Sequence, residues 1–117
     1  MEPSGTTQVF IENNSIKWEQ VAQGVKRKVV AWDEQLMLVR VEFEKGAVGA
    51  LHEHHHSQIT HVESGSFEVR IGEENKILHA GDAYIVPPNS IHGCLCLEPG
   101  VLIDAFSPKR DEFVPES

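Results

Sequence analysis

The sequence has few cysteines and an acidic rather than a basic balance of charge. Cys94 and Cys96 are its only cysteines, which is too few for a disulfide-stapled secreted scaffold. They lie one residue apart, so a disulfide between them would be strained. Ten Lys and Arg residues against 18 Asp and Glu residues give a formal net charge of -8. This balance argues against nucleic acid as a partner, because binding to it requires a basic surface.

Long apolar runs are also missing. No stretch of the sequence approaches the ~20 apolar residues needed to cross a bilayer. The first residues, from Met1 to Thr6, lack the basic start and apolar core of a signal peptide. We therefore expect a cytoplasmic, reduced protein with no membrane partner.

The sequence does contain a succession of short segments rich in β-branched residues and bounded by turn residues. They cover residues 25–31, 36–43, 59–62, 67–71, 76–78, 83–86, 91–97 and 101–106. Within one of them Met37, Val39, Val41 and Phe43 share one face of a strand. Strands spaced by roughly 8–12 residues, with Gly or Pro at the corners, predict an all-β protein built as a closed or sandwiched barrel.

We expect a single barrel domain over residues 16–114, after an N-terminal arm over 1–15 and before a tail over 115–117. Residues 9–11 of the arm could add an edge strand. The basic triplet 26–28 lies inside an alternating segment and is interpreted as the solvated face of a strand. No helix longer than one turn is expected, and that turn would lie between Pro108 and Pro115.

Histidine is the most unevenly distributed residue. Residues 52–56 hold four of the seven histidines, and His92 follows a Pro-Pro-Asn turn. Neutral imidazole is the commonest protein ligand of transition metals. On a strand His52 and His54 point to one side, and Gln58 can rejoin that face after an irregularity. If this face lines the barrel interior, three imidazoles and one amide oxygen can meet on a single ion.

The other histidines and both cysteines have simpler interpretations. His55 and His56 are expected in a loop, although His56 could line the mouth of a cavity. We expect His61 to be packed or hydrogen-bonded on a strand, and His79 to be exposed. Cys94 and Cys96 share a face with His92, and we interpret them as small buried apolar residues, with thiolate ligation of a metal as the alternative.

Two motifs in this sequence resemble those of the cupin family. The first is a Gly, His-x-His, carboxylate and Gly pattern, and the second is a Gly, Pro-x-Gly, His and Asn pattern. They occur here as Gly46, His52, His54, Gln58 and Gly65, and as Gly81, Pro87, Asn89, His92 and Cys96. The resemblance implies a double-stranded β-helix, or jelly-roll barrel. It also implies one divalent transition metal ion (Zn, Ni, Fe, Mn or Co) held by His52, His54, Gln58 and His92.

This sequence departs from the cupin pattern at three positions. Asn89 replaces a Gly, which is a mild change because Asn tolerates a positive φ. Cys96 replaces an Asn, which leaves the role of that position open. Gln58 replaces the usual Glu, so all four ligands are neutral and the ion keeps its full charge. Such an ion is suited to Lewis-acid chemistry on anionic oxygens.

The segment 99–113 resembles the tail of the pectin-degradation cupins, which open the ring of 4,5-unsaturated uronate monosaccharides from pectin or alginate. The resemblance implies that Asp104 moves a proton, that Phe106 stacks on the sugar and that Arg110 holds its carboxylate. Asp104 and Phe106 also share a face by strand parity. The resemblance further implies a small anionic sugar-acid substrate, a linear keto-deoxyuronate product and a homodimer.

Two other functions remain open at this stage. One is a metal-dependent dioxygenase-type cupin acting on a small organic molecule, which oxygen uptake would reveal. The other is a non-enzymatic cupin that only binds a small molecule. Asp104 could also be an edge carboxylate, Phe106 a plain core residue, and Arg110 a surface partner of Asp111 or Glu112.

Overall fold

The computed structural model describes residues 9–115, and most of the expected tail (residues 116–117) and of the expected arm (residues 1–8) lies outside that range. In order along the chain, the elements are η1 (Asn13–Ser15), β1 (Glu19–Ala22), β2 (Val25–Trp32), β3 (Met37–Phe43), β4 (Val48–His52), β5 (Ser57–Ile71), β6 (Glu74–His79), β7 (Ala83–Val86), β8 (His92–Ser107) and η2 (Asp111–Phe113). The all-β prediction is confirmed. Among the described residues, no helix is long and apolar enough to cross a membrane.

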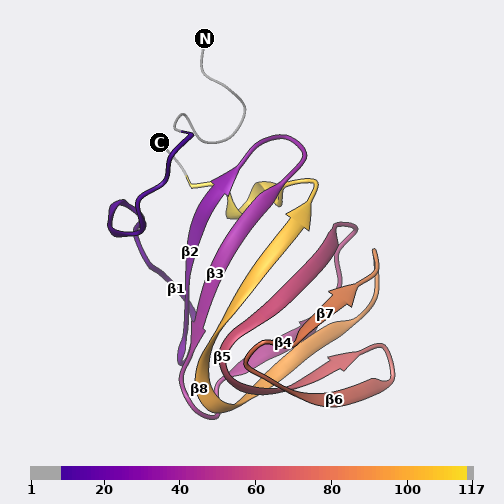
Figure 1. Cartoon of the computed structure of the whole chain (residues 1–117). Coiled ribbons are helices and arrows are strands. Elements are labelled where there is room, and N and C mark those ends of the chain that lie inside the picture. Colours follow the sequence, from indigo (N-terminus) through magenta and orange to yellow (C-terminus); the bar gives the residue numbers. More distant parts are fainter. Residues whose placement is uncertain (1–8, 116–117) are drawn as a thin grey trace.

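Two long strands, β5 and β8, run through both halves of the barrel (Figure 1). The first part of β5 pairs with the second part of β8, and the outer neighbours of this pair are β7 and β3. The second part of β5 pairs with the first part of β8. The outer neighbours of this second pair are β6, beside β5, and β4, beside β8. Each long strand replaces two of the expected segments, because the chain bends at residues 64–66 and 98–100 without losing its pairing.

Glycine is required where β5 and β8 bend across each other. A Cβ on Gly100 would lie 2.1 Å from the carbonyl oxygen of Ser64. Gly65 has a φ of +79°, and a Cβ there would lie 2.6 Å from the Glu98 oxygen. Side chains at these points would push the backbones apart, so the glycines permit the close crossing that shapes the barrel.

The core consists of buried side chains in two clusters. Phe43 and Phe67 meet edge to face with ring centroids 5.2 Å apart. Val62, Cys96 and Leu102 pack in the same buried cluster. The expected alternation along β3 is present, since Met37, Val39 and Phe43 are buried. Met37 and Val39 belong to a second buried cluster with Val29 and Phe106, so the core has two parts.

Two expectations about the N-terminal third are wrong. Residues 9–11 form no strand, and the arm instead makes the single turn of η1. Lys28 is not solvated: it is buried, and its Nζ donates to the main-chain and side-chain oxygens of Asn13 at 3.1 and 3.2 Å. The Lys28 ammonium also lies 4.6 Å from the Trp18 ring centroid. The long lysine stem thus attaches the arm to β2.

Candidate metal centre and active site

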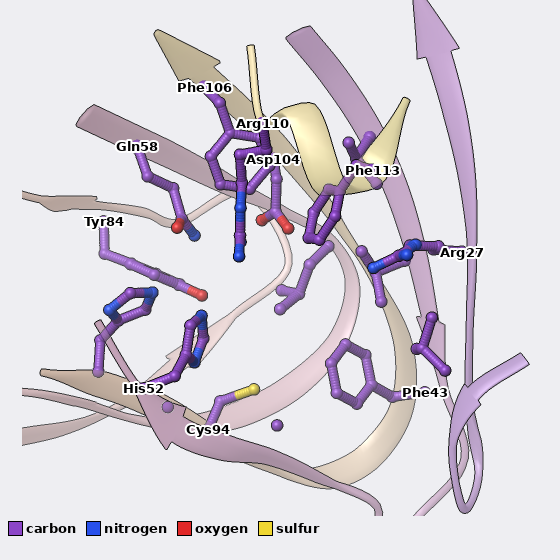
Figure 2. A pocket seen from close by; sticks show the side chains of 17 residues that line it. Arg27, Phe43, His52, Gln58, Tyr84, Cys94, Asp104, Phe106, Arg110 and Phe113 are labelled. Atoms are coloured by element: carbon purple, nitrogen blue, oxygen red, sulfur yellow. The ribbon is translucent and has the colours of Figure 1, made fainter. Parts of the chain in front are cut away.

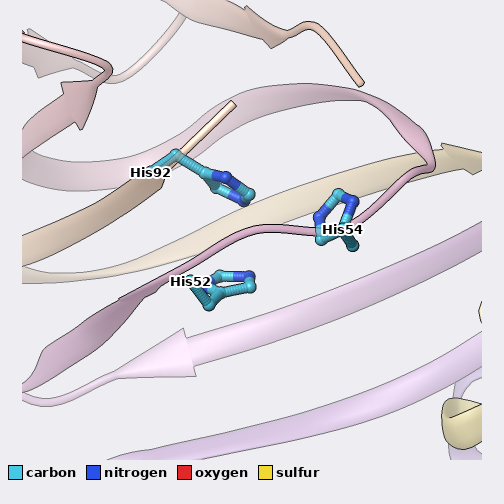
Figure 3. Close-up of side chains that lie close together, drawn as sticks. All are labelled: His52, His54 and His92. Carbon is cyan, nitrogen blue, oxygen red and sulfur yellow. The ribbon is translucent and has the colours of Figure 1, made fainter. Parts of the chain in front are cut away.

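Three histidines from separate parts of the chain lie close together (Figure 3). His52 ends β4 and is paired with His92, the first residue of β8. His54 lies in the short connection to β5. Their ligand atoms all lie within 4.8 Å of one another. The strand pairing therefore brings together residues that are about 40 positions apart in the sequence.

Each of these imidazoles has its Nδ1 fixed by a backbone carbonyl two residues away. The distances are 2.8 Å from His52 to Ala50, 3.1 Å from His54 to His56 and 2.9 Å from His92 to Ser90. A carbonyl only accepts, so Nδ1 carries the proton in each ring and Nε2 keeps a free lone pair. Such carbonyl partners are the usual support of metal-binding histidines.

The amide of Gln58 is oriented in the same way. Its Nε2 donates to the hydroxyl of Thr60 at 2.8 Å, and its Oε1 lies 3.1 Å from Nε2 of His54. With the His54 proton on Nδ1, both of these facing atoms are acceptors. Two lone pairs that face each other are stabilised by a cation close to both.

The burial of His92 gives a second indication that the site suits a metal ion. Its Nε2 is buried and has no hydrogen-bond partner among the described residues, which is unusual for a native polar atom. The pKa of His92 is lowered to about 4, chiefly by burial and also by the neighbouring His52 and His54. Burial also lowers the pKa of His54. Both shifts favour the neutral imidazole that metal binding requires. The residues present fit a divalent transition metal.

A cavity of about 150 Å³ opens beside the histidines (Figure 2). This is smaller than the ~300–1,000 Å³ of pockets for drug-sized ligands, so the cavity suits a small molecule. Its inner wall is apolar, with Val39, Val41 and Leu102. Figure 2 shows Gln58 and Asp104 pointing into the same space.

Asp104 is the carboxyl group of this cavity. It lies on the inward face of β8, and its Oδ1 accepts a hydrogen bond of 2.6 Å from the hydroxyl of Thr60. Burial raises the pKa of Asp104 to about 6, while the Thr60 hydrogen bond and the Arg110 guanidinium act in the opposite direction. A carboxyl group with such a pKa can both accept and return a proton near neutral pH.

Aromatic rings and guanidinium groups form the mouth of the cavity. Arg110 lies over Phe106 at 5.2 Å and over Phe113 at 4.0 Å, measured from its Cζ to the ring centroids. Its Nη2 also pairs with Glu112 at 2.9 Å, so the surface pairing considered from the sequence occurs together with its place at the cavity. Arg27 covers Phe113 at 3.9 Å. One aromatic ring is thus held between two guanidinium groups.

Sequence reasoning missed several cavity residues. Arg27 belongs to the triplet that was interpreted as solvated, yet it lines the cavity. Tyr84 and Phe113 also line the cavity, and Thr60 hydrogen-bonds two cavity residues. None of the three is a named position of the motifs, and only the inward parity of Tyr84 and Thr60 on their strands could have indicated them. Burial keeps the Tyr84 phenol neutral by raising its pKa well above 10, with the Asp104 charge as a smaller cause.

The structure confirms some of the expectations for the remaining histidines and cysteines and contradicts others. His61 is exposed, so the expectation of a packed residue is wrong, because the outer face of β5 is turned to solvent. His55 and His79 are exposed, whereas His56 is buried in its loop and does not line the cavity. Cys94 lines the cavity, where burial raises its thiol pKa to about 12. That shift favours a neutral thiol over a thiolate ligand.

A β-barrel that brings three imidazoles together at one point is typical of a cupin. The chain matches the Cupin_2 family, described as the cupin domain, over residues 39–106, and it belongs to that family. More narrowly, it is 50% identical over 107 residues to the pectin degradation protein KdgF of Dickeya dadantii strain 3937, covering 90% of this chain and 96% of that protein.

Solved structures agree with this placement. KdgF from Halomonas sp. has a TM-score of 0.87 and 43% identity, over 92% of this chain and all of that one. An RmlC-like cupin from Shewanella frigidimarina has a TM-score of 0.89 and 40% identity, over 92% of this chain and 96% of that one.

Proposed function

We propose that the protein is a metal-dependent enzyme that opens the ring of 4,5-unsaturated uronate monosaccharides and releases linear keto-deoxyuronates. The observation that carries the proposal is Asp104, a half-buried carboxyl group in the same small cavity as Gln58, His52 and His92. The 50% identity to a pectin degradation protein supports the substrate class. The size of the cavity favours one sugar ring over a polymer chain.

The ligand set would consist of His52, His54, His92 and the Oε1 atom of Gln58. A divalent ion held there supplies a Lewis acid that attracts the sugar carboxylate and the oxygen on which negative charge develops. Because every ligand is neutral, none of the ion's charge is offset by the protein donors. Phe106 supplies an apolar surface for the sugar face, and Arg110 supplies a planar cation for its carboxylate.

Asp104 carries out the proton transfers. In its ionised form it takes the proton of the anomeric hydroxyl group. The new carbonyl forms at the anomeric carbon as the bond from that carbon to the ring oxygen breaks. The electron pair of that bond stays on the ring oxygen as an enolate conjugated to the carboxylate. Asp104 then gives its proton to the neighbouring alkene carbon. The product is an isomer of the substrate with no net redox change, and such transfers typically contribute ~10²–10⁴-fold.

Turnover of unsaturated galacturonate, followed by loss of the absorbance of its conjugated alkene, tests the proposal. We expect Asp104→Asn to lose at least ~10²-fold in kcat, with metal content per chain equal to the wild type. Asp82→Asn is the matched control, because the Asp82 carboxylate bonds only the His79 amide in a distant turn. Full turnover by Asp104→Asn would remove Asp104 from the mechanism.

Oxygen measurements separate this function from the alternatives. Ring opening consumes no oxygen, whereas a dioxygenase-type cupin would consume oxygen in proportion to substrate. Saturable uronate binding without turnover would instead indicate a binding protein. The homodimer expected from the resemblance stays a prediction, and light scattering during gel filtration measures it.

A further inference from the structure

Thr60 belongs to neither cupin motif, yet it lies between the expected metal ligand and the cavity carboxyl group. It is on the inward face of β5 and is fully buried. On its two sides it is paired with Tyr84 of β7 and Asp104 of β8. Its hydroxyl oxygen lies 2.8 Å from Nε2 of Gln58 and 2.6 Å from Oδ1 of Asp104. Two functional side chains therefore meet at one hydroxyl group.

The direction of these two hydrogen bonds is fixed by chemistry. An ionised Asp104 carboxylate can only accept, so the single hydroxyl proton of Thr60 is donated to it. The Thr60 oxygen then has only lone pairs to offer to Gln58. The amide must therefore present its Nε2 to Thr60, which turns Oε1 towards Nε2 of His54, 3.1 Å away. The flipped amide would present an NH₂ group to the imidazoles, and that group cannot bind a metal ion.

We propose that Thr60 is a positioning residue that fixes the orientation of the Gln58 amide for metal binding and links it to the ionised Asp104. The part that concerns Asp104 rests on the function proposed above, whereas the part that concerns the metal does not. Fixing the orientation matters more for a Gln than for a Glu. Either oxygen of a carboxylate can bind a metal ion, whereas only the Oε1 end of an amide can. Supporting hydrogen bonds of this kind typically change metal affinity 10–100-fold when they are removed.

Zinc affinity of the metal-free protein, measured by competition with a chromophoric chelator, tests the metal-binding part of the proposal. Thr60→Val keeps the shape of the side chain and removes the hydroxyl, so we expect its Kd for zinc to rise 10–100-fold. Thr60→Ser keeps the hydroxyl and should restore the Kd to within about threefold of the wild type. A loss caused by packing alone would not be rescued in this way, because serine lacks the methyl group.

Ser66→Ala is a matched control on the same strand. Ser66 is also buried, and its hydroxyl donates to Glu98 at 2.8 Å, but neither residue lines the cavity. Its zinc affinity should equal that of the wild type. Thermal unfolding of each metal-free variant shows whether it folds. If Thr60→Val has no cooperative transition, Thr60→Ala removes the same hydroxyl with less side-chain volume and is measured instead.

Wild-type zinc affinity in the variants that lack the hydroxyl would overturn the proposal, and so would a Thr60→Ser variant as weak as Thr60→Val. These outcomes do not depend on the substrate. If the wild type fails to open unsaturated uronates but the zinc affinities follow the expected order, the proposed function fails and the role of Thr60 stands. If the enzyme is active, kcat of Thr60→Val should fall at least tenfold and recover in Thr60→Ser.

Discussion

Replacing Asp104 with Asn should make the metal-free protein more stable at neutral pH while removing its activity. Burial raises the pKa of Asp104 from 3.8 to about 6, so the folded state holds this proton more tightly than the unfolded chain does. Near pH 7 the carboxyl group is ionised in both states, and ionisation in the folded state is penalised. A shift of about two pKa units corresponds to about 3 kcal/mol. Asn keeps the shape and the Oδ1 acceptor for Thr60 without a charge to bury.

The sign of the pH dependence follows from the raised pKa. Between about pH 4 and pH 6 the folded wild type retains a proton that the unfolded chain has released. Wild-type stability therefore falls across that window and levels off above it. The Asn variant cannot titrate at this position. Its free energy of unfolding should therefore exceed that of the wild type by about 1 kcal/mol at pH 4.5 and by about 3 kcal/mol at pH 7. The advantage at pH 7 corresponds to a Tm higher by roughly 10 °C for a domain of this size.

Urea unfolding of metal-free wild type and Asp104→Asn at pH 4.5, 6 and 8 measures this difference. Metal is removed because a bound cation would favour the ionised form of Asp104. The histidines titrate in both proteins, so their effect largely cancels in the difference between the two free energies of unfolding. Asp82→Asn, in its exposed turn, should show no comparable gain. A difference that is the same at all three pH values, or an Asn variant less stable at pH 8, would refute the reasoning.

Three further predictions concern activity and metal binding. Because Asp104 must be ionised to accept the first proton, kcat/KM should fall tenfold per pH unit below the pKa of Asp104 in the metal-loaded enzyme, which a bound cation lowers from the value of about 6 in the metal-free site; a pH–rate profile with no fall on the acid side would contradict this. Gln58→Glu adds a negative charge to the donor set, so zinc affinity should rise at least ~tenfold while kcat falls, and chelator competition with steady-state kinetics tests both. Arg110→Lys keeps the charge but loses the planar fork, so KM should rise about tenfold with little change in kcat, and a loss confined to kcat would argue against substrate binding by Arg110.

The sequence predicts the barrel well because strand periodicity and turn residues are local signals. The Met37–Phe43 alternation and the positive φ of Asn89 are both found in the structure. The continuity of β5 and β8 was not predicted, since Gly65 in a local window indicates a turn. Only the pairing partner across the crossing shows that the strand continues. β1 and β4 were missed as well, because their exposed residues lack a clear alternation.

The site was predictable where spacing carries the information and not where packing does. Strand parity predicts His52 and His54 on one side. In the structure His54 lies just beyond β4, in the connection to β5, and both histidines still lie close to His92. Arg27 and Phe113 are different, because nothing in their local sequence indicates that their side chains stack at 3.9 Å. That contact depends on η2 folding back over β2. Long-range contacts of this kind need coordinates, whereas metal-binding motifs do not.

The placement of charge shows why a neutral ligand set and an acidic protein are compatible. The chain carries a formal net charge of -8, yet among residues 9–115 Asp104 is the only carboxylate that lines the cavity. Two guanidinium groups, those of Arg27 and Arg110, line the same space. A divalent ion held by neutral donors would make this region more positive still. An anionic sugar would therefore be attracted locally against the overall charge of the protein. The proposed chemistry needs a base in this cavity, and Asp104 supplies it. The raised pKa of Asp104 is a consequence of its burial in the cavity.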